Sequence, residues 1–355
     1  MKESFSLDAL LRDNIKKLVP YSSARDEFKG EASILLDANE NAFGSPYSKN
    51  FNRYPDPLQH RVKEKLYKIK GVPAENMFLG NGSDEAIDIL YRAFCEPGKD
   101  NVILVPPTYG MYEVSANINN VAYRKVNLTM DYQLDLDNIA GAIDPYTKLI
   151  FICSPNNPTG NSIRRQDIET ILVNFQGIVV VDEAYINFAK QPSFSKNLAE
   201  FPNLVVLQTL SKAWGLAALR LGMAFASREI IDIFNKIKPP YNINQATQDI
   251  VLEALDNVDM VNEWIKEIVA ERDKLTVSLE RLPQVARVTP SDANFILVKL
   301  EEPRRLYNFL VDKGIIVRDR SKVELCEGCL RLTIGTPGEN KVLLQAIHTF
   351  YNTTA

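Results

Sequence analysis

The chain has 355 residues, of which 45% are hydrophobic and 24% charged, a composition that excludes wholesale disorder. At roughly 150 residues per domain, this length predicts about two domains. The 41 basic and 45 acidic residues give a net charge of −4, which argues against nucleic-acid binding as the main function. The chain has only two histidines, His60 and His348, which excludes a His-rich zinc site. Neither has the nucleophile-like neighbour that a Ser-His-Asp triad would require.

The N-terminal region is charged and amphipathic over residues 7–17, which predicts a polar helix and not a signal peptide. No stretch reaches the roughly 18 apolar residues that a membrane span requires. We therefore expect a cytoplasmic protein with reduced thiols and no membrane contact. Cys326 and Cys329 form a C-x-x-C, but Cys95 and Cys153 supply no second pair for zinc, so we interpret the spacing as coincidence.

From residue 58 to residue 210, helical and strand patterns alternate. A helix is predicted over 58–70. Three pairs follow, each a strand-like run and then a helix-like run: 77–81 with 86–94, 101–107 with 109–119, and 148–154 with 164–175. Two further strand-like runs lie at 177–182 and 204–210. Several of these strands are continuous apolar runs, as a parallel sheet covered by helices on both faces requires. The pattern predicts a large, doubly wound α/β domain over residues 45–240.

The pattern changes after Pro239-Pro240, which we interpret as the domain boundary. A long helical region over 243–282 is followed by strand-like runs and a terminal helix, at 293–300, 314–319, 329–335 and 338–350. This order predicts a smaller α+β domain over residues 241–355. Residues 1–44 are expected to form an N-terminal arm that belongs to the small domain.

Polar residues collect after four of the predicted strands, at the edge where open parallel sheets bind ligands. The four segments are GNGSDE at 80–85, CSPNNPTG at 153–160, DEAY at 182–185 and TLSKAWG at 209–215. Each has an ordinary explanation as well: a helix entry, a plain loop, a structural ion pair and a surface lysine. Asn157-Pro158 is also a candidate cis peptide bond.

Taken together, these segments hold complementary chemical groups. Lys212 lies at the mouth of an apolar sheet, where partial desolvation lowers the pKa of an amine and makes it a nucleophile. Asp182 ends a buried strand and needs a partner, for which a cationic ligand group is one candidate. An amine nucleophile, a buried acid, an Asn and a Tyr for a ring hydroxyl, and several phosphate donors are what pyridoxal 5'-phosphate requires.

The sequence resembles the fold-type-I pyridoxal-phosphate-dependent aminotransferases of class I and II, from about Tyr21 to the C-terminus. The segments that carry the resemblance are PYSSAR (20–25), LDANENAFG (36–44), RYPDP (53–57), GNGSDE (80–85), PPTYGMY (106–112), SPNNPTG (154–160), VDEAY (181–185), LSKAWGLAALRLG (210–222), VRD (317–319) and GCLRLTIG (328–335). The resemblance implies an α/β fold with a mostly parallel sheet sandwiched by helices, plus a smaller α+β domain.

The resemblance also implies a role for each matching residue. Lys212 is expected to bind the cofactor covalently and to move the proton at the substrate α-carbon, with Asp182 on the ring nitrogen. Asn157 and Tyr185 are expected on the ring oxygen and Tyr109 on the ring face. The complete set implied to bind the cofactor within one chain is Ser83, Asp84, Tyr109, Asn157, Asp182, Tyr185, Ser211, Lys212 and Arg220, where Ser83 and Asp84 contribute backbone amides to the phosphate.

Tyr54 is implied to reach the cofactor phosphate of a second subunit, so we expect a homodimer with shared sites. Arg331 resembles the arginine that clamps a substrate carboxylate. Tyr21 and Arg318 are expected to bind a substrate phosphate.

Asn39, in the NEN segment, is also expected to contact the substrate. Arg320 follows two residues after Arg318, and the sequence leaves open which of the two arginines faces the site.

The subfamily segments PYSSAR, NEN and RYPDP imply the reaction of L-histidinol phosphate with 2-oxoglutarate, which gives imidazole-acetol phosphate and L-glutamate in histidine biosynthesis. Two alternatives share the fold: an aromatic amino acid aminotransferase and a threonine-phosphate decarboxylase. A non-enzymatic regulator that keeps the fold as a ligand sensor is a more distant alternative, against which the short N-terminal arm and the acidic net charge argue.

Overall fold

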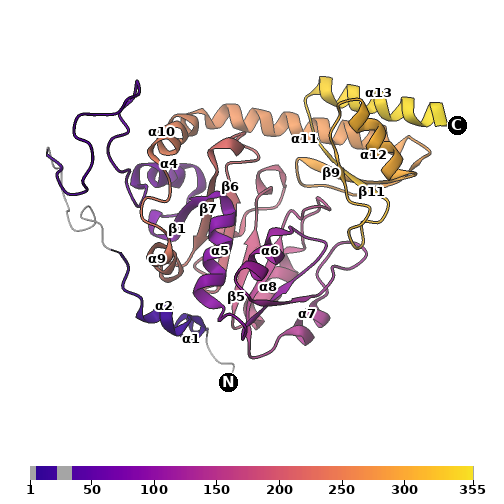
Figure 1. Cartoon of the computed structure of the whole chain (residues 1–355). Coiled ribbons are helices and arrows are strands. Elements are labelled where there is room, and N and C mark those ends of the chain that lie inside the picture. Colours follow the sequence, from indigo (N-terminus) through magenta and orange to yellow (C-terminus); the bar gives the residue numbers. More distant parts are fainter. Residues whose placement is uncertain (1–4, 22–33, 355) are drawn as a thin grey trace.

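The computed structural model describes residues 5–21 and 34–354 of the chain. A sheet of seven strands forms the larger part and a sheet of four strands the smaller part. Helix α11 (Val258–Glu280) runs along one side of the molecule from the larger part to the smaller (Figure 1). The predicted fold class, an α/β sheet with a second, smaller α+β part, is confirmed.

The large sheet has the strand order β1-β7-β6-β5-β4-β2-β3. Its strands are β1 (Met77–Asn81), β2 (Asn101–Leu104), β3 (Ala122–Lys125), β4 (Thr147–Cys153), β5 (Ile178–Asp182), β6 (Leu204–Thr209) and β7 (Leu221–Ala226). Strands β2 to β6 pair in parallel, and β7 is antiparallel to both of its neighbours, β1 and β6. The carboxyl ends of β4, β5 and β6 therefore lie together at one edge.

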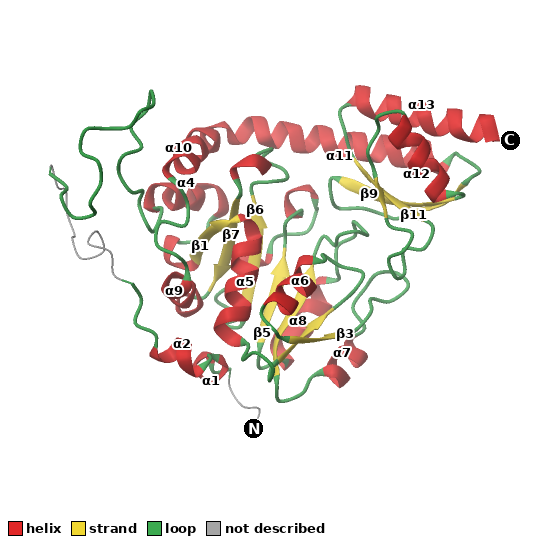
Figure 2. Cartoon of the chain, in the orientation of Figure 1, coloured by secondary structure: helices red, strands yellow, loops and turns green. Residues whose placement is uncertain are grey.

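Helices cover both faces of this sheet (Figure 2). They are α4 (His60–Lys70), α5 (Gly82–Phe94), α6 (Met111–Ile118), α7 (Leu136–Ala142), α8 (Arg165–Asn174), α9 (Arg228–Ile237) and α10 (Gln245–Ala254). Successive residues of β5 enter opposite cores: Val179 and Val181 pack in one apolar cluster, Ile178 and Val180 in the other. Because both faces are buried, the strand is apolar at every position before Asp182 and not at alternate ones.

The small sheet is antiparallel, with the order β10-β11-β9-β8. Its strands are β8 (Val285–Val288), β9 (Phe295–Leu300), β10 (Arg318–Asp319) and β11 (Cys329–Thr333). Together with α11, α12 (Pro303–Asp312) and α13 (Pro337–Thr354), it encloses a core of its own around Ile296, Val298 and Leu330. The domain limits at residues 44 and 240 stay a prediction.

The structure adds several elements that the sequence patterns did not predict, among them β3, β7, β8, α7, α9 and α12. Strand β7, LGMAFA, was missed because Gly and Ala have low strand propensity. Tertiary packing explains one of these small residues, since a Cβ at Gly222 would lie 2.2 Å from the backbone N of Ser83.

Two predicted elements have different bounds. The helix expected over 7–17 is divided into α1 (Leu7–Leu10) and α2 (Asp13–Lys17), and the strand expected over 314–319 is reduced to β10. Among residues 5–21 and 34–354, no helix combines the length and the apolar character of a membrane span.

Candidate active site

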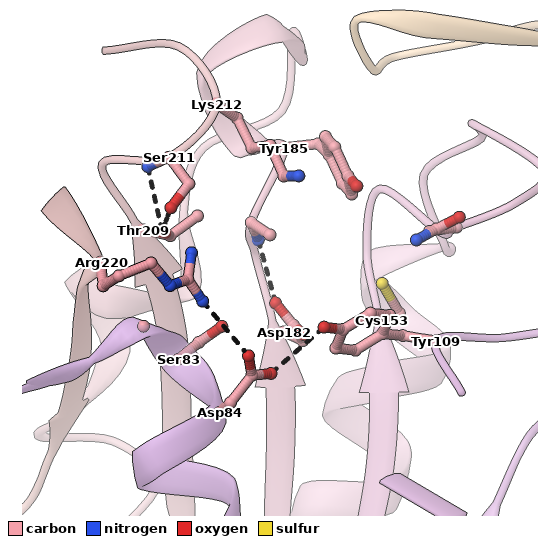
Figure 3. Close-up of a pocket in the computed structure, with 13 residues that line it drawn as sticks. Ser83, Asp84, Tyr109, Cys153, Asp182, Tyr185, Thr209, Ser211, Lys212 and Arg220 are labelled. Atoms are coloured by element: carbon pink, nitrogen blue, oxygen red, sulfur yellow. Dashed lines mark hydrogen bonds and ion pairs between the residues drawn. The ribbon is translucent and has the colours of Figure 1, made fainter. Parts of the chain in front are cut away.

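A pocket opens at the carboxyl ends of β4, β5 and β6, beside the N-terminus of α5 (Figure 3). All residues implied to bind the cofactor, except Tyr54, line it: Ser83, Asp84, Tyr109, Asn157, Asp182, Tyr185, Ser211, Lys212 and Arg220. Segments far apart in the sequence thus converge because parallel strands present their carboxyl ends at one edge.

Asp182 is the last residue of β5 and is 3% exposed. Its carboxylate accepts hydrogen bonds from Tyr112 Oη at 2.7 Å and from the backbone N of Ala184 at 3.1 Å. Burial raises the pKa of Asp182 to about 6, and these hydrogen bonds oppose the rise. The side chain is therefore a buried acid whose charge a cationic ligand group would stabilise.

Lys212 follows β6 and points its amine over the ring of Tyr185, with Nζ 5.6 Å from the ring centroid (Figure 3). Burial lowers the pKa of Lys212, the nearby Arg331 guanidinium lowers it further, and Asp182 opposes the shift. A larger share of the amine is therefore neutral near pH 7 than for an exposed lysine, as nucleophilic attack and proton transfer require.

The opposite side of the pocket is suited to an anion. Helix α5 begins at Gly82, so its first backbone N–H groups and the positive end of its dipole face the pocket. Arg220 contributes a guanidinium. Its backbone is left-handed (φ 54°), and its carbonyl oxygen accepts a hydrogen bond from Gly82 N at 2.6 Å. The side chain of Asp84 lies here too, 3.5 Å from Arg220 Nη2, and accepts from Tyr109 Oη at 3.2 Å.

Arg331 of β11 links the small sheet to Asn157, a residue that lines the pocket. Arg331 Nη1 donates to Asn157 Oδ1 at 2.5 Å, and its guanidinium lies 5.1 Å from the ring centroid of Phe295. Its Nε is buried and has no hydrogen-bond partner among the described residues. A planar donor with a free edge beside the pocket is suited to a carboxylate.

Arg318 and Arg320 differ in burial. Arg318 is exposed and is the cross-strand partner of Arg331, whereas Arg320 is half-buried. The Nε of Arg320 is buried without a hydrogen-bond partner in the described part of the chain. Burial lowers the pKa of Arg320, as does Arg318, while Tyr185 of the pocket raises it. Of the two arginines, Arg320 is thus the more enclosed and is within electrostatic range of the pocket.

Five predicted site residues do not line the pocket: Arg318 and Arg331 of the small sheet, and Tyr54, Asn39 and Tyr21. Tyr54 and Asn39 line a second hollow, where Tyr54 stacks on Tyr241 with ring centroids 4.6 Å apart. Tyr21 is 74% exposed and does not line either hollow. Residues 22–25 of the PYSSAR segment lie outside the described residues.

Other pocket residues were not singled out from the sequence. Gly82, Cys153 and Thr209 line the pocket, and the Oγ1 of Thr209 accepts from the backbone N of Ser211 at 3.0 Å. The sequence signal that could have identified these three residues was their position at or next to the end of a predicted strand. Tyr112 was quoted only as part of PPTYGMY and had no assigned role. The cis peptide bond expected at Asn157-Pro158 is present.

Comparison with known proteins identifies the family. The profile of "Aminotransferase class I and II" matches residues 34–347. The chain is 57% identical to a histidinol-phosphate aminotransferase of Cytophaga hutchinsonii over 347 residues, which cover 98% of this chain and 100% of the relative. It is 54% identical to the enzyme of that name from Bacteroides thetaiotaomicron over 343 residues, 96% of this chain and 98% of the relative.

Solved structures agree on the fold. The histidinol-phosphate aminotransferase of Sinorhizobium meliloti, in complex with pyridoxal 5'-phosphate, superposes with a TM-score of 0.78 at 23% identity, covering 90% of each chain. L-threonine-O-3-phosphate decarboxylase from Porphyromonas gingivalis reaches 0.72 at 20% identity, covering 85% of this chain and 91% of that one. The fold alone therefore does not separate these activities, whereas the full-length identities do. The chain belongs to the class I and II aminotransferases and, within them, to the histidinol-phosphate aminotransferases.

Proposed function

We propose that the protein transfers the amino group of L-histidinol phosphate to 2-oxoglutarate, with pyridoxal 5'-phosphate as cofactor. The observation that carries this function is the single pocket that joins Lys212, Asp182 and the anion-binding end of α5 in a chain 57% identical to a histidinol-phosphate aminotransferase.

The residues present fit this cofactor. Asp182 is a buried carboxylate that forms no ion pair with any residue the structure describes, and a protonated ring nitrogen would supply the missing cation. Gly82 lies at the anion-binding end of the pocket, where a Cβ on this residue would lie 2.9 Å from Arg220 Nη2. When bound, the cofactor supplies an electron sink that makes the substrate α-hydrogen acidic.

The side chains of the pocket divide the remaining tasks. Lys212 Nζ holds the cofactor and then removes and returns the proton at the substrate α-carbon. Asp182 keeps the ring nitrogen protonated, and Asn157 and Tyr185 orient the ring oxygen. Tyr109 packs against the ring face. Ser211, Arg220 and the backbone N–H groups of Ser83 and Asp84 hold the phosphate.

Two amino donors of different shape must enter the same pocket. Arg331 is suited to the carboxylate of glutamate, because its guanidinium has an unpartnered edge beside the pocket. The phosphate of histidinol phosphate would be bound by Arg318 and, more closely, by the enclosed Arg320. Tyr21 and Asn39 are proposed as further substrate contacts, which require the N-terminal arm to approach a pocket.

A homodimer would explain the exposed arm before α4. The described part of this segment, which begins at residue 34, extends away from the body of the molecule on the side of α4 and α10 (Figure 1). Its apolar side chains are open to solvent: Leu36 is 84% exposed, Phe43 102% and Tyr47 67%. A second subunit would bury this surface and would receive Tyr54 at its own pocket. Cytoplasmic location is proposed together with this biosynthetic role.

The absorption spectrum of the purified, cofactor-loaded protein tests the function. Adding L-histidinol phosphate alone should convert the visible band of the bound cofactor to that of its aminated form, and 2-oxoglutarate should restore it. A response to phenylalanine but not to histidinol phosphate, or carbon dioxide release from threonine phosphate, would instead support the aromatic aminotransferase or the decarboxylase.

A further inference from the structure

We propose that Tyr112 is a positioning residue that keeps Asp182 ionised and oriented, so that the proton shared with the cofactor stays on the ring nitrogen. This inference depends on the proposed function only in that the pocket binds pyridoxal phosphate. It does not depend on the identity of the substrate.

Tyr112 is the second residue of helix α6, two residues after the PPTYG segment (106–110), and is fully buried. Its ring stacks on Phe151 of β4, with centroids 4.9 Å apart and planes at 20°. It also meets Tyr109 edge to face, at 5.5 Å and 85°. These rings fix the side chain so that its hydroxyl reaches Asp182 Oδ2 at 2.7 Å.

The direction of this hydrogen bond is chemically determined. Burial raises the pKa of Tyr112, so its hydroxyl keeps its proton and donates it to the carboxylate oxygen. The second oxygen of Asp182 accepts from the backbone N of Ala184 at 3.1 Å. Two donors on one carboxylate favour its ionised form over its protonated form.

This preference matters once a pyridine ring faces Asp182. A proton between a carboxylate and a ring nitrogen can rest on either group, and burial alone favours the neutral carboxylic acid. The hydroxyl of Tyr112 opposes burial, and so it favours the protonated ring on which the electron sink depends. Tyr112 does not line the pocket, so its hydroxyl acts through Asp182, while its ring contacts Tyr109 and is kept in Tyr112→Phe.

Tyr91 provides a matched control for the experiment. It is also fully buried and stacks on the same ring, with its centroid 5.4 Å from that of Phe151. Its hydroxyl donates to the backbone O of Tyr112 at 2.8 Å and not to Asp182. Tyr91→Phe thus removes one buried hydroxyl from the same aromatic stack without touching the carboxylate.

The full-length protein and both variants, Tyr112→Phe and Tyr91→Phe, are loaded with pyridoxal phosphate that carries an isotope-labelled ring nitrogen. NMR then reports the protonation of that nitrogen, and a fluorescence titration reports cofactor affinity. In Tyr112→Phe, we expect the nitrogen signal to move toward its unprotonated position and affinity to fall about tenfold, the effect of losing a hydrogen bond to a charged group. In Tyr91→Phe, the signal should remain that of the unmodified protein.

A protonated nitrogen signal in folded Tyr112→Phe would overturn the proposal, whatever the affinity. A signal that moves equally in both variants would also overturn it, since the cause would then be general packing. If Tyr112→Phe does not fold, para-aminophenylalanine at position 112 keeps the ring and offers a weaker donor, and should move the signal less but in the same direction. Failure of the unmodified protein to bind the cofactor would instead refute the proposed function.

Discussion

Arg331 of the small sheet donates a hydrogen bond from Nη1 to Asn157 Oδ1, in the loop after β4 of the large sheet, at 2.5 Å. The contact joins a residue proposed to bind the substrate carboxylate with a residue proposed to bind the cofactor ring. Because Arg331 also lowers the pKa of Lys212, one guanidinium influences substrate, cofactor and amine together. A negatively charged substrate on Arg331 would weaken that influence and make Lys212 a stronger base.

Replacing Arg331 should separate the two amino donors. We expect Arg331→Gln to raise KM for glutamate by roughly 100-fold, the order expected when a charged partner of a carboxylate is removed. KM for histidinol phosphate should change much less, because its phosphate binds elsewhere. Steady-state kinetics of both half-reactions test this, with Arg331→Lys as the variant that keeps the charge. Equal losses with both donors would refute the assignment of Arg331 to the carboxylate.

Arg318 and Arg320 form a natural pair for comparison, because they lie two residues apart and differ mainly in burial. We expect Arg320→Gln to raise KM for histidinol phosphate about tenfold, as the loss of one charged hydrogen bond does, and Arg318→Gln to raise it less. Glutamate kinetics should be unchanged in both. If only Arg318→Gln affects histidinol phosphate, the exposed arginine is the phosphate ligand.

Mixing two inactive variants tests whether subunits share sites. Tyr54→Ala and Lys212→Ala should each have little activity as homodimers. After mixing and exchange of subunits, a hybrid dimer has one intact site, so activity should return to roughly a quarter of that of the unmodified protein under random pairing. Mixing Lys212→Ala with Asp182→Ala is the control, since both residues line the same pocket of one chain. No recovery in the first mixture would place Tyr54 within its own subunit's site, or show that no exchange occurs, which the rate of subunit exchange distinguishes.

The cofactor-free protein should lose stability as Asp182 ionises. Burial raises the pKa of this residue from 3.8 to about 6 in the folded protein, so its protonated form is favoured on folding. The stabilisation of the folded protein by protonated Asp182 is complete below about pH 4 and is lost as pH rises through about 6. Asp182→Asn does not ionise and should gain on the order of 3 kcal/mol relative to the unmodified protein between about pH 4 and about pH 8, since each pKa unit corresponds to about 1.4 kcal/mol.

Denaturant unfolding of both cofactor-free proteins at these pH values measures this difference. Glu183, whose pKa burial raises to about 7, titrates in both proteins and cancels in the comparison. A stability difference that does not change with pH would contradict the prediction. The same substitution should sharply reduce catalysis, because it removes the acid that we propose to face the ring nitrogen.

Local patterns predicted most strands of the large sheet but not strand β7, which lies between β1 and β6. Strands β4, β5 and β6 were recognisable because their residues are apolar at nearly every position, and helix α4 because its pattern ends at Gly71. Strand β7 was not recognisable, since its Gly and Ala have low strand propensity and its Gly222 is explained only by a close approach to the backbone of Gly82 and Ser83. Such a contact between distant segments leaves no periodic signal.

The sequence by itself determined the chemistry of this protein: Lys212, Asp182 and the Gly-rich turn at 80–85 stand at strand ends, and strand ends of a parallel sheet meet at one edge. Only the tertiary structure decided which side chains reach that edge from elsewhere. Tyr112 reaches Asp182 because aromatic packing against Phe151 aims its hydroxyl. Arg320, whose backbone N donates to Cys329 O at 2.9 Å, is half-buried, whereas Arg318 is exposed. These relationships depend on distances between segments far apart in the chain, which residue types and spacing do not encode locally.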